Sequence, residues 1–223
     1  MLKYPCLVLD HDDTVVQSMK TLSYPFFCYV LETFRPGASM SQEDYIAACY
    51  HLGFLELCRQ YFHFTDREQA QEHRMWMDYL RSHTPDPYPG IGSIIRRQKQ
   101  EGGMLCVVSH SAEENITRDY RTHFGLLPDT IYGWDLPACQ RKPNTYPLLD
   151  IMEKYRFRPE EILVVDDMKL AWQMADPLGV SVAYAGWNGL NIPEIGEEMH
   201  RLCNFSFDTT ASLEQFLFDS KTP

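Results

Sequence analysis

The sequence predicts an α/β fold, in which a parallel sheet carries helices on both faces and a helical block interrupts the chain. Four short apolar runs have the composition of buried parallel strands: residues 6–9, 104–108, 162–165 and 180–184. Helical patterns follow the last three runs, and this alternation is typical of a parallel sheet. Between the first two runs, the region from 16 to 89 shows no comparable strand.

The interrupting block contains three helical patterns, over residues 23–34, 41–62 and 65–83. Thr65 and Glu68 have the spacing of a capping box, and Ser41 with Asp44 forms a weaker version of it. Gly53 breaks the middle pattern and indicates two helices there.

A linker with three prolines, residues 83–90, returns the chain to the α/β pattern. We therefore expect two domains: residues 1–16 with 90–223 as an α/β core, and residues 17–89 as an inserted helical domain.

Local signals mark the other elements. Ser111 and Glu114 have capping-box spacing, so a helix should start after the second run, with Ser111 as its cap. Residues 158–161 predict a turn before the third run. Near the C-terminus, residues 203–208 predict a last short strand, and Thr210 is expected to cap a final helix through Phe216.

Composition narrows the possible partners. The formal net charge is −11, from 20 basic and 31 acidic side chains. This balance argues against a nucleic-acid-binding protein, which needs a Lys/Arg surface to displace counterions. It leaves open a phosphorylated metabolite, because a bound cation can invert the local field.

Seven cysteines, none in a C-x-x-C spacing, favour a reducing compartment over a disulfide framework or a zinc site. The first residues do not resemble a signal peptide, because their apolar run is short and leads directly into acids. No apolar stretch approaches the length of a membrane span, so we expect a cytoplasmic protein without a membrane partner.

Acidic residues follow two of the predicted strands. Asp10 and Asp12 come after the first run, and Asp166 with Asp167 after the third. If these strands are adjacent, their carboxylates form a hard-cation site suited to Mg²⁺. The alternative for the first pair is an acidic cap that holds backbone amides at the end of the strand.

Ser109 ends the second run, where its hydroxyl and the nearby amides suit a phosphate oxygen, although a helix-entry residue is the alternative. Lys142 could damp the repulsion between the carboxylates, although an exposed lysine is the alternative. For His11 and His110 we expect packed or hydrogen-bonded side chains, with the backbone amide of His110 as its more useful group.

Taken in order, these residues resemble the four motifs of the haloacid dehalogenase superfamily. The helical block resembles the C1 cap of phosphoglycolate phosphatases and β-phosphoglucomutases in that superfamily. Segments 87–91 and 124–133 resemble its return to the core and its approach to the lysine motif. The resemblance implies a Rossmann-like core with a helical cap that closes over the substrate. The motif residues are Asp10, His11, Asp12, Asp13 and Thr14, then Ser109, Lys142, Asp166 and Asp167.

The resemblance also implies roles. Asp10 would attack phosphorus, and Asp12 would act as general acid and then general base. Lys142 would stabilise Asp10 and the phosphoryl oxygens. The implied phosphate-binding residues are Thr14, Ser109, His110 and Lys142. The implied Mg²⁺ ligands are Asp10, the backbone carbonyl of Asp12, and Asp167, supported by Asp166.

The resemblance favours hydrolysis of a phosphate ester. Asp12 is present, whereas dehalogenases of the superfamily lack this acid. Leu22 stands where mutase relatives carry a histidine, which lowers the mutase alternative without eliminating it. A catalytically silent protein that binds a phosphorylated ligand or a partner protein is a third reading.

Several residues depart from the superfamily pattern. Asp13 replaces a glycine, although Asp tolerates similar backbone conformations. Ala171 replaces an acid that some relatives carry, and Thr145 replaces a proline. Gly179 stands where relatives end a helix with glycine.

The expected activity is therefore that of a Mg²⁺-dependent phosphatase acting on a small phosphorylated metabolite, as a monomer or homodimer. The aromatic residues of the helical block are expected to form its core. Solvated positions are expected for Arg59, Arg35 and Lys20, although each could reach an anionic leaving group.

Overall fold

The structure, a computed structural model of the chain, describes residues 2–189 and 192–219 and divides into two compact units. The α/β unit comprises residues 2–17, 86–189 and 196–219. The helical unit comprises residues 18–85 with 192–195. Each unit is described in turn.

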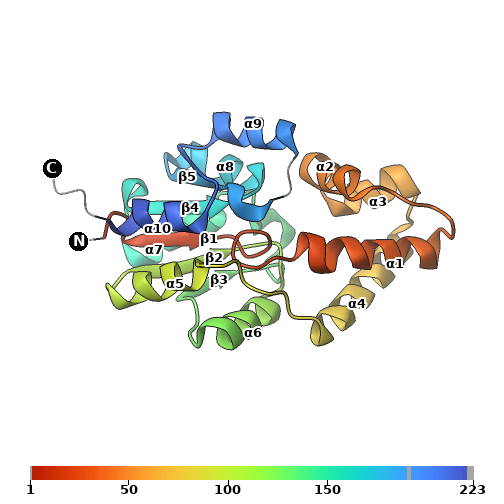
Figure 1. Cartoon of the computed structure of the whole chain (residues 1–223), viewed down its shortest axis with the longest axis horizontal. Helices are drawn as coiled ribbons and strands as arrows, with labels where there is room; N and C mark the ends of the chain where they lie inside the picture. Colours follow the sequence, from red (N-terminus) through yellow and green to blue (C-terminus); the bar gives the residue numbers. More distant parts are fainter. Residues whose placement is uncertain (1, 190–191, 220–223) are drawn as a thin grey trace. The chain divides into compact units, whose positions relative to one another are not determined.

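The α/β unit is built on a six-stranded parallel sheet with the order β3-β2-β1-β4-β5-β6, as far as the described residues show (Figure 1). The four predicted apolar strands are confirmed to within one residue at each end, and the last short strand lies inside the predicted residues 203–208. The short strand β3 was not predicted, because three residues carry too little pattern. The strands are β1 (Cys6–Leu9), β2 (Met104–Val108), β3 (Thr130–Tyr132), β4 (Ile162–Asp166), β5 (Ser181–Ala185) and β6 (Phe205–Phe207).

Side chains alternate between the two faces of the sheet, and each face has its own helices. Leu7 and Leu9 of β1 pack in a cluster with residues of α5, α6 and α10. Cys6 and Val8 point to the opposite face, where α7 and α8 supply the packing. Because both faces are covered, the strands are almost uniformly apolar. These helices are α5 (Ile91–Gln100), α6 (Glu113–Phe124), α7 (Tyr146–Tyr155), α8 (Lys169–Ala175) and α10 (Thr210–Phe218).

Shorter elements complete the unit. Helix α9 spans Pro193–Leu202, and most of it belongs to the α/β unit. Single 3₁₀ turns lie at η2 (Ala138–Gln140), η3 (Pro159–Glu161), η4 (Asp176–Leu178) and η5 (Gly186–Asn188). Gly179 ends η4 with a φ of 69°, a left-handed conformation that favours glycine, as the sequence predicted.

Two predicted helix caps are wrong. Helix α6 begins after Ala112, and the Ser111 side chain does not cap it. The last helix is capped by Thr209, whose side chain accepts a hydrogen bond from the Ser212 amide. Thr210 instead donates its hydroxyl to the Pro89 carbonyl at 2.6 Å. In both cases the side chain makes a distant contact in place of the local one.

The two chain segments that lead to and from the helical unit pair with each other inside the α/β unit. The Gln17 amide donates to the Asp86 carbonyl, and the Tyr88 amide donates to the Val15 carbonyl, each at 2.9 Å. Val16 and Pro87 form an antiparallel bridge. Residues 15–17 and 86–88 therefore form a short two-stranded ribbon, which we call the linker ribbon.

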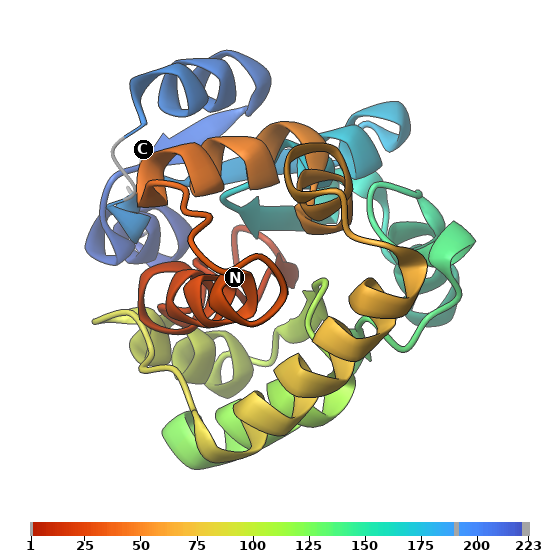
Figure 2. The same cartoon turned by 90° about the vertical axis from the view of Figure 1, so that its right-hand side faces the viewer.

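The helical unit contains no strand in the part that the structure describes, as predicted. After a π-helical turn (Met19–Ser23) come α1 (Tyr24–Phe34), α2 (Gln42–Leu52), α3 (Phe54–Phe62) and α4 (Asp66–Ser82). Figure 2 shows α2 in orange and the longer α4 in yellow-orange. Gly53 separates α2 from α3 with a φ of 80°, which confirms the predicted break. The caps at Ser41 and Thr65 are confirmed as well.

Aromatic packing holds the helical unit together. Phe27 stacks on Tyr45 with ring centroids 4.5 Å apart, and Phe26 lies 5.0 Å from Trp76. These contacts confirm that most of the aromatic residues form its core, whereas Tyr61 is 57% exposed. Two basic residues that could have reached a ligand are engaged within the unit: Arg35 pairs with Glu68, and Arg59 pairs with Glu56 and Asp66.

One carboxyl group is buried in this apolar setting. Glu72 of α4 is only 6% exposed, and burial raises its pKa to about 7. Its carboxylate interacts electrostatically with Tyr45 of α2 and Cys58 of α3, which are themselves buried. None of these neighbours supplies a positive charge to the carboxylate.

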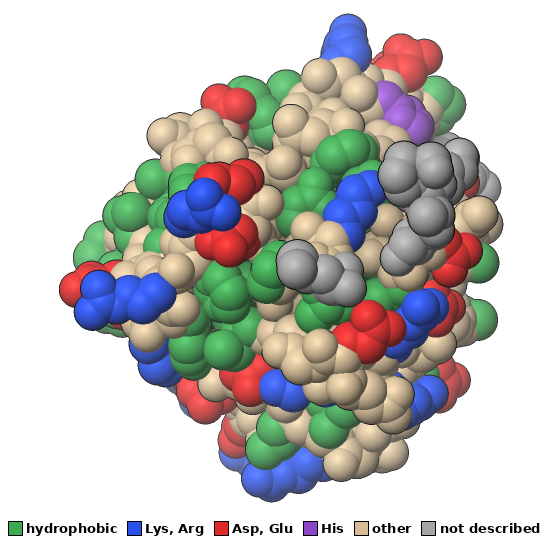
Figure 3. All heavy atoms as spheres, turned by 90° about the vertical axis from the view of Figure 1, so that its left-hand side faces the viewer, with side chains coloured by type: hydrophobic (Ala, Val, Ile, Leu, Met, Phe, Trp, Pro, Cys, Tyr) green, Lys and Arg blue, Asp and Glu red, His purple; other side chains and the backbone are tan. Residues whose placement is uncertain are grey.

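No helix in the described ranges combines the length and hydrophobicity that a membrane crossing requires. On the face of the molecule in Figure 3, the described Lys and Arg side chains are dispersed among Asp and Glu. They form no continuous basic surface there. This agrees with the acidic composition.

Candidate active site

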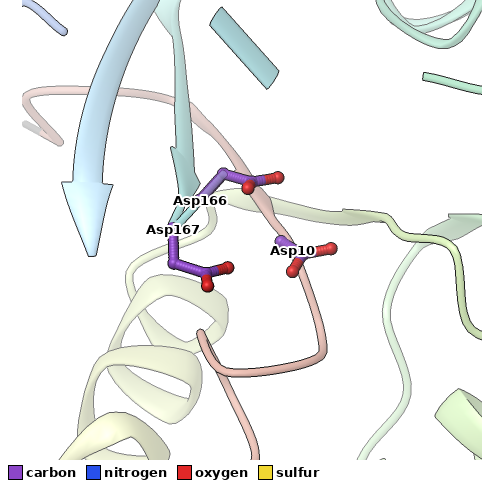
Figure 4. A group of neighbouring side chains, drawn as sticks. All are labelled: Asp10, Asp166 and Asp167. Atoms are coloured by element: carbon purple, nitrogen blue, oxygen red, sulfur yellow. The ribbon is translucent and has the colours of Figure 1, made fainter. Parts of the chain in front are cut away.

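Three buried carboxylates meet at the carboxyl ends of two adjacent strands. Asp10 follows β1, Asp166 ends β4, and Asp167 comes next (Figure 4). The strands pair directly, with Leu9 opposite Val165, and the Asp10 amide donates to the Val165 carbonyl at 2.9 Å. One oxygen of each carboxylate lies within 4.8 Å of the others. The structure thus joins acids separated by more than half of the chain.

Lys142 lies between two of these carboxylates. Its Nζ donates to Oδ1 of Asp10 and to Oδ2 of Asp166, each at 2.7 Å. The second oxygen of Asp166 accepts a hydrogen bond of 2.7 Å from the Met168 amide. Both oxygens of Asp166 are therefore engaged by the protein, whereas the described residues donate no hydrogen bond to Oδ2 of Asp10.

The charges of this group do not balance. Burial alone would lower the pKa of Lys142, but Asp10 and Asp166 outweigh it and raise the pKa. Burial raises the pKa of Asp166 in spite of Lys142. The pKa of Asp167 is raised well above its usual range by burial and by the neighbouring carboxylates of Asp166, Asp13 and Asp10. One ammonium group among three carboxylates leaves two formal negative charges.

This residual charge fits a divalent cation. Carboxylate oxygens are the ligands that Mg²⁺ prefers, and they converge here at a buried position. A dication would offset the repulsion that raises the pKa of Asp167. The donor set is therefore suited to Mg²⁺ on chemical and electrostatic grounds.

Asp12 lies beside this group and faces a different partner. Its side chain is half-buried, and its Oδ2 accepts a hydrogen bond of 2.5 Å from the Ser111 hydroxyl. Sequence reasoning missed this contact, because Ser111 has the spacing of a helix cap. A signal was available: Ser109 and Ser111 are two positions apart after a strand, where alternate side chains can share a side.

A second set of contacts surrounds Asp167. The Asn188 amide donates to its Oδ2 at 3.3 Å, and the Thr14 hydroxyl lies 3.5 Å from its Oδ1. Trp187 donates its indole N–H to the Thr14 carbonyl at 3.1 Å. Thr14 thus faces an acid rather than an open surface. Asn188 was not singled out from the sequence, where its only signal is its place after β5.

Asp13 is a buried loop residue, as expected. Its φ of 56° is left-handed, which explains how it can replace a glycine. Tyr88 donates its hydroxyl to Asp13 at 3.2 Å. Burial and the Asp13 and Asp167 carboxylates raise the pKa of Tyr88, which keeps it a donor.

The second strand brings Ser109 to the same rim of the sheet. Ser109 is buried; its amide donates to the Tyr132 carbonyl at 3.0 Å, and its hydroxyl accepts from the Ser111 amide at 3.2 Å. The His110 ring bonds through Nε2 to the Lys142 carbonyl at 2.8 Å and packs edge-on against Trp134. Phosphate binding by Ser109, His110 and Thr14 stays a prediction.

His11 points away from the carboxylates. Its ring is buried and bonds through Nε2 to Asp119 of α6 at 3.1 Å. Burial would raise the pKa of Asp119, but His11 and Arg118 outweigh it and lower the pKa. The packed and hydrogen-bonded role expected for His11 is confirmed.

Part of the chain is similar in sequence to curated phosphoglycolate phosphatases. Over 112 residues, the chain is 32% identical to a phosphoglycolate phosphatase from Pasteurella multocida (strain Pm70); this segment covers 48% of each chain. The chain thus spans about half the length of the curated relatives it matches.

Solved structures share the fold across nearly the whole chain. A protein described as a predicted phosphoglycolate phosphatase from Haemophilus somnus 129pt has a TM-score of 0.75 at 19% identity, covering 97% of this chain and 99% of its own. The protein CbbY from Rhodobacter sphaeroides, in complex with xylulose-(1,5)bisphosphate, has a TM-score of 0.75 at 18% identity, covering 96% of each chain.

A family model for haloacid dehalogenase-like hydrolases matches residues 7–185. The match begins in β1, before Asp10, and ends with β5, beyond Asp167. It therefore includes every carboxylate described above and Lys142. The chain belongs to the haloacid dehalogenase-like hydrolase family.

Proposed function

We propose that the chain is a Mg²⁺-dependent phosphomonoesterase that works through an aspartyl-phosphate on Asp10. The observation that carries this proposal is the buried group of Asp10, Asp166 and Asp167, with Lys142 bonded to two of the three. An acidic strand cap would explain bonds to backbone amides, but not a buried lysine and an excess of two negative charges.

The reaction proceeds in two steps. In the first, a carboxylate oxygen of Asp10 forms a bond to phosphorus, and the bond from phosphorus to the ester oxygen breaks. Asp12 gives its proton to that oxygen, which leaves as an alcohol. In the second step, water attacks phosphorus and gives its proton to Asp12. Inorganic phosphate leaves, and the Asp10 carboxylate is restored.

Mg²⁺ would be held by Asp10, by Asp167 and by the backbone carbonyl of Asp12. Asp166 supports the site, because Lys142 and the Met168 amide already engage both of its oxygens. When bound, the cation supplies positive charge to the phosphoryl oxygens during transfer.

The transferring phosphoryl group would be bound by Ser109, the His110 amide and Lys142, with Thr14 supporting the loop. Among these groups, Lys142 would supply the positive charge to the phosphoryl oxygens. Two carboxylates hold its ammonium group in place before the substrate binds. This preorganisation lowers the cost of stabilising the charge that develops in the transition state.

The substrate would be a small phosphorylated metabolite. Phosphoglycolate, which gives the Pasteurella multocida relative its name, is the first ester to test. Residues 17–89 would form the cap domain that selects it, and residues 1–16 with 90–223 the catalytic core. A monomer or homodimer in the cytoplasm completes the proposal. None of the seven cysteines forms a disulfide, which suits a reducing compartment.

Hydrolysis is favoured over mutase chemistry. Leu22 stands where a mutase would need a histidine, and it is buried in the helical unit, 6% exposed. A leucine can neither donate nor accept a proton. Water is then the acceptor of the phosphoryl group.

Phosphate release from a panel of monoesters tests the proposal. Purified chain with Mg²⁺ should hydrolyse 4-nitrophenyl phosphate, and a chelator should abolish the activity. Asp10→Asn should lower kcat by a factor on the order of 10⁴ or more, because the nucleophile is lost. Asp78→Asn, in which the replaced side chain of α4 is 71% exposed, should keep wild-type activity.

Three results would contradict the proposal. Wild-type rates in Asp10→Asn would show that Asp10 is not the nucleophile. Conversion of a sugar phosphate to its isomer without phosphate release would indicate a mutase. No turnover of any ester while calorimetry shows bound Mg²⁺ would indicate a silent binding protein.

A further inference from the structure

Ser111 makes a contact that neither helix capping nor the proposed phosphate site explains. It lies between β2 and α6, and its hydroxyl donates to Oδ2 of Asp12 at 2.5 Å. Helix α6 starts after Ala112 without using this hydroxyl. The bond therefore links the residue proposed as general acid to a different strand end, far away in the sequence.

The backbone of Ser111 is fixed on both sides. Its amide donates to the Ser109 hydroxyl at 3.2 Å, and its carbonyl accepts from the Trp134 amide at 2.9 Å. One residue before Trp134, Gly133 packs closely. A Cβ at Gly133 would lie 2.8 Å from the Ser111 carbonyl oxygen and 3.0 Å from the Glu113 amide nitrogen. Only glycine lets the segment after β3 approach so closely.

Asp135 strengthens the same clamp. Its Oδ2 accepts from the Glu113 amide at 2.7 Å. Residues 133–135 thus hold residues 111–113 at three points, two hydrogen bonds and one close packing contact. Because these contacts fix the Ser111 backbone, its hydroxyl already faces Asp12, and little conformational entropy is lost in keeping this bond when the substrate binds.

We propose that Ser111 is a positioning residue that holds the Asp12 carboxyl group in the orientation for proton transfer; this inference rests on the proposed function. Ser111 engages Oδ2, so Oδ1 is the oxygen that carries the proton to the ester oxygen. As the bond from phosphorus to that oxygen breaks, the proton passes from Oδ1 and leaves Asp12 as a carboxylate. The Ser111 proton stays on Ser111 and keeps its bond to Oδ2.

Substrates whose leaving groups differ in basicity can test this role of Ser111. A strongly basic alkoxide must be protonated as it departs, whereas a weakly basic dinitrophenolate departs without a proton. Loss of orientation at Asp12 therefore slows the hydrolysis of alkyl phosphates and spares 2,4-dinitrophenyl phosphate. A general loss of folding or of phosphate binding would slow both classes equally.

The experiment measures kcat/KM of Ser111→Ala for 2,4-dinitrophenyl, 4-nitrophenyl, phenyl and simple alkyl phosphates. We expect a loss of about 10- to 100-fold for alkyl esters, part of the 10²–10⁴ that a general acid contributes, and little change for the dinitrophenyl ester. Ser111→Thr should restore most of the loss. Ser93→Ala, which removes a hydroxyl from the exposed face of α5, should match wild type.

Two further measurements keep the test decisive if Ser111→Ala folds poorly. Gly133→Ala should show the same dependence on the leaving group, because it displaces the Ser111 backbone. Gly196→Ala, where a Cβ meets no atom within 4 Å, is its control. In an Asp12→Asn background, Ser111→Ala should have no further effect on alkyl esters.

Equal losses across all leaving groups, or a rise in KM alone, would overturn the role of Ser111 while leaving the proposed phosphatase intact. Full additivity with Asp12→Asn would also overturn it. Absence of any hydrolysis by the wild-type chain would overturn the phosphatase itself, and this inference with it.

Discussion

The two units treat buried charge in opposite ways. In the α/β unit, Asp10 and Asp166 are buried with Lys142, which comes from a distant loop and bonds both. In the helical unit, Glu72 is buried beside Tyr45 and Cys58, and no described Lys or Arg pairs with it. The first arrangement holds a positive charge in place between two carboxylates. The second makes the helical unit sensitive to pH.

The difference also shows in what holds each unit together. Strands of the α/β unit place polar groups at one end and apolar groups along their length. The helical unit has an aromatic core and surface ion pairs such as Arg35 with Glu68. Exposed ion pairs can therefore be removed from the helical unit at small cost, and removal of the charge on Glu72 should stabilise it.

Removal of Lys142 should have the largest effect on stability. Lys142→Met leaves Asp10 and Asp166 buried without their shared counter-charge, which should lower the free energy of unfolding by about 3–5 kcal/mol. Urea denaturation with a chelator present isolates this ion pair from any bound cation. Lys99→Met breaks a partly exposed pair with Asp129 and should cost no more than about 1 kcal/mol. An equal loss of unfolding free energy in the two variants would show that the buried ion pair of Lys142 contributes no more than the partly exposed pair of Lys99.

Neutralisation of Glu72 should act in the opposite direction. Its pKa is about 7 in the folded chain, against an ordinary value of 4.5, because burial disfavours the charge. The folded state thus holds its proton longer, and stability falls as pH rises from 4.5 to 7. Glu72→Gln should remove this fall and raise the free energy of unfolding at pH 8 by at most about 3 kcal/mol.

Urea denaturation at pH 5 and pH 8, followed by far-UV circular dichroism, measures the Glu72 effect. Glu32→Gln, an exposed position on α1, is the matched control and should leave the pH dependence unchanged. If the free energy of unfolding of Glu72→Gln changes between pH 5 and pH 8 as in wild type, the Glu72 carboxyl group does not cause the loss of stability.

Replacement of Asn188 should have the smallest effect, and it should change only the affinity for Mg²⁺. Its amide donates to Oδ2 of Asp167. Asn188→Ala should weaken Mg²⁺ binding by about tenfold, because groups that orient a metal ligand typically have effects of that size. Isothermal titration calorimetry measures it, with Gln60→Ala of the helical unit as the control. An unchanged Kd would mean that Asn188 does not orient Asp167.

Much of the α/β unit could be predicted from the sequence, for a physical reason. Parallel strands buried on both faces must be apolar, and their carboxyl ends converge at one rim. Asp10, Asp166 and Asp167 are therefore visible as acids that follow apolar runs. Lys142 could be singled out only through the order of the motifs, since a lone lysine carries no such signal.

The contacts that escaped prediction are those in which a distant partner competes with a local one. Ser111 has the spacing of a helix cap, but Asp12 takes its hydroxyl. Thr210 stands one residue beyond the true cap and bonds Pro89 instead. Strand β3 is too short to show a pattern and exists because β2 offers it a free edge. Such outcomes depend on tertiary geometry that local spacing does not contain.

The linker ribbon makes the helical unit an exchangeable module. Residues 15–17 and 86–88 pair antiparallel, so the two ends of the insertion stand side by side, as in a hairpin stem. A tight two-residue turn could close that stem in place of residues 18–85. The α/β unit would keep its whole sheet and all of its carboxylates. Insertions of other sizes could be grafted at the same point without rebuilding the sheet.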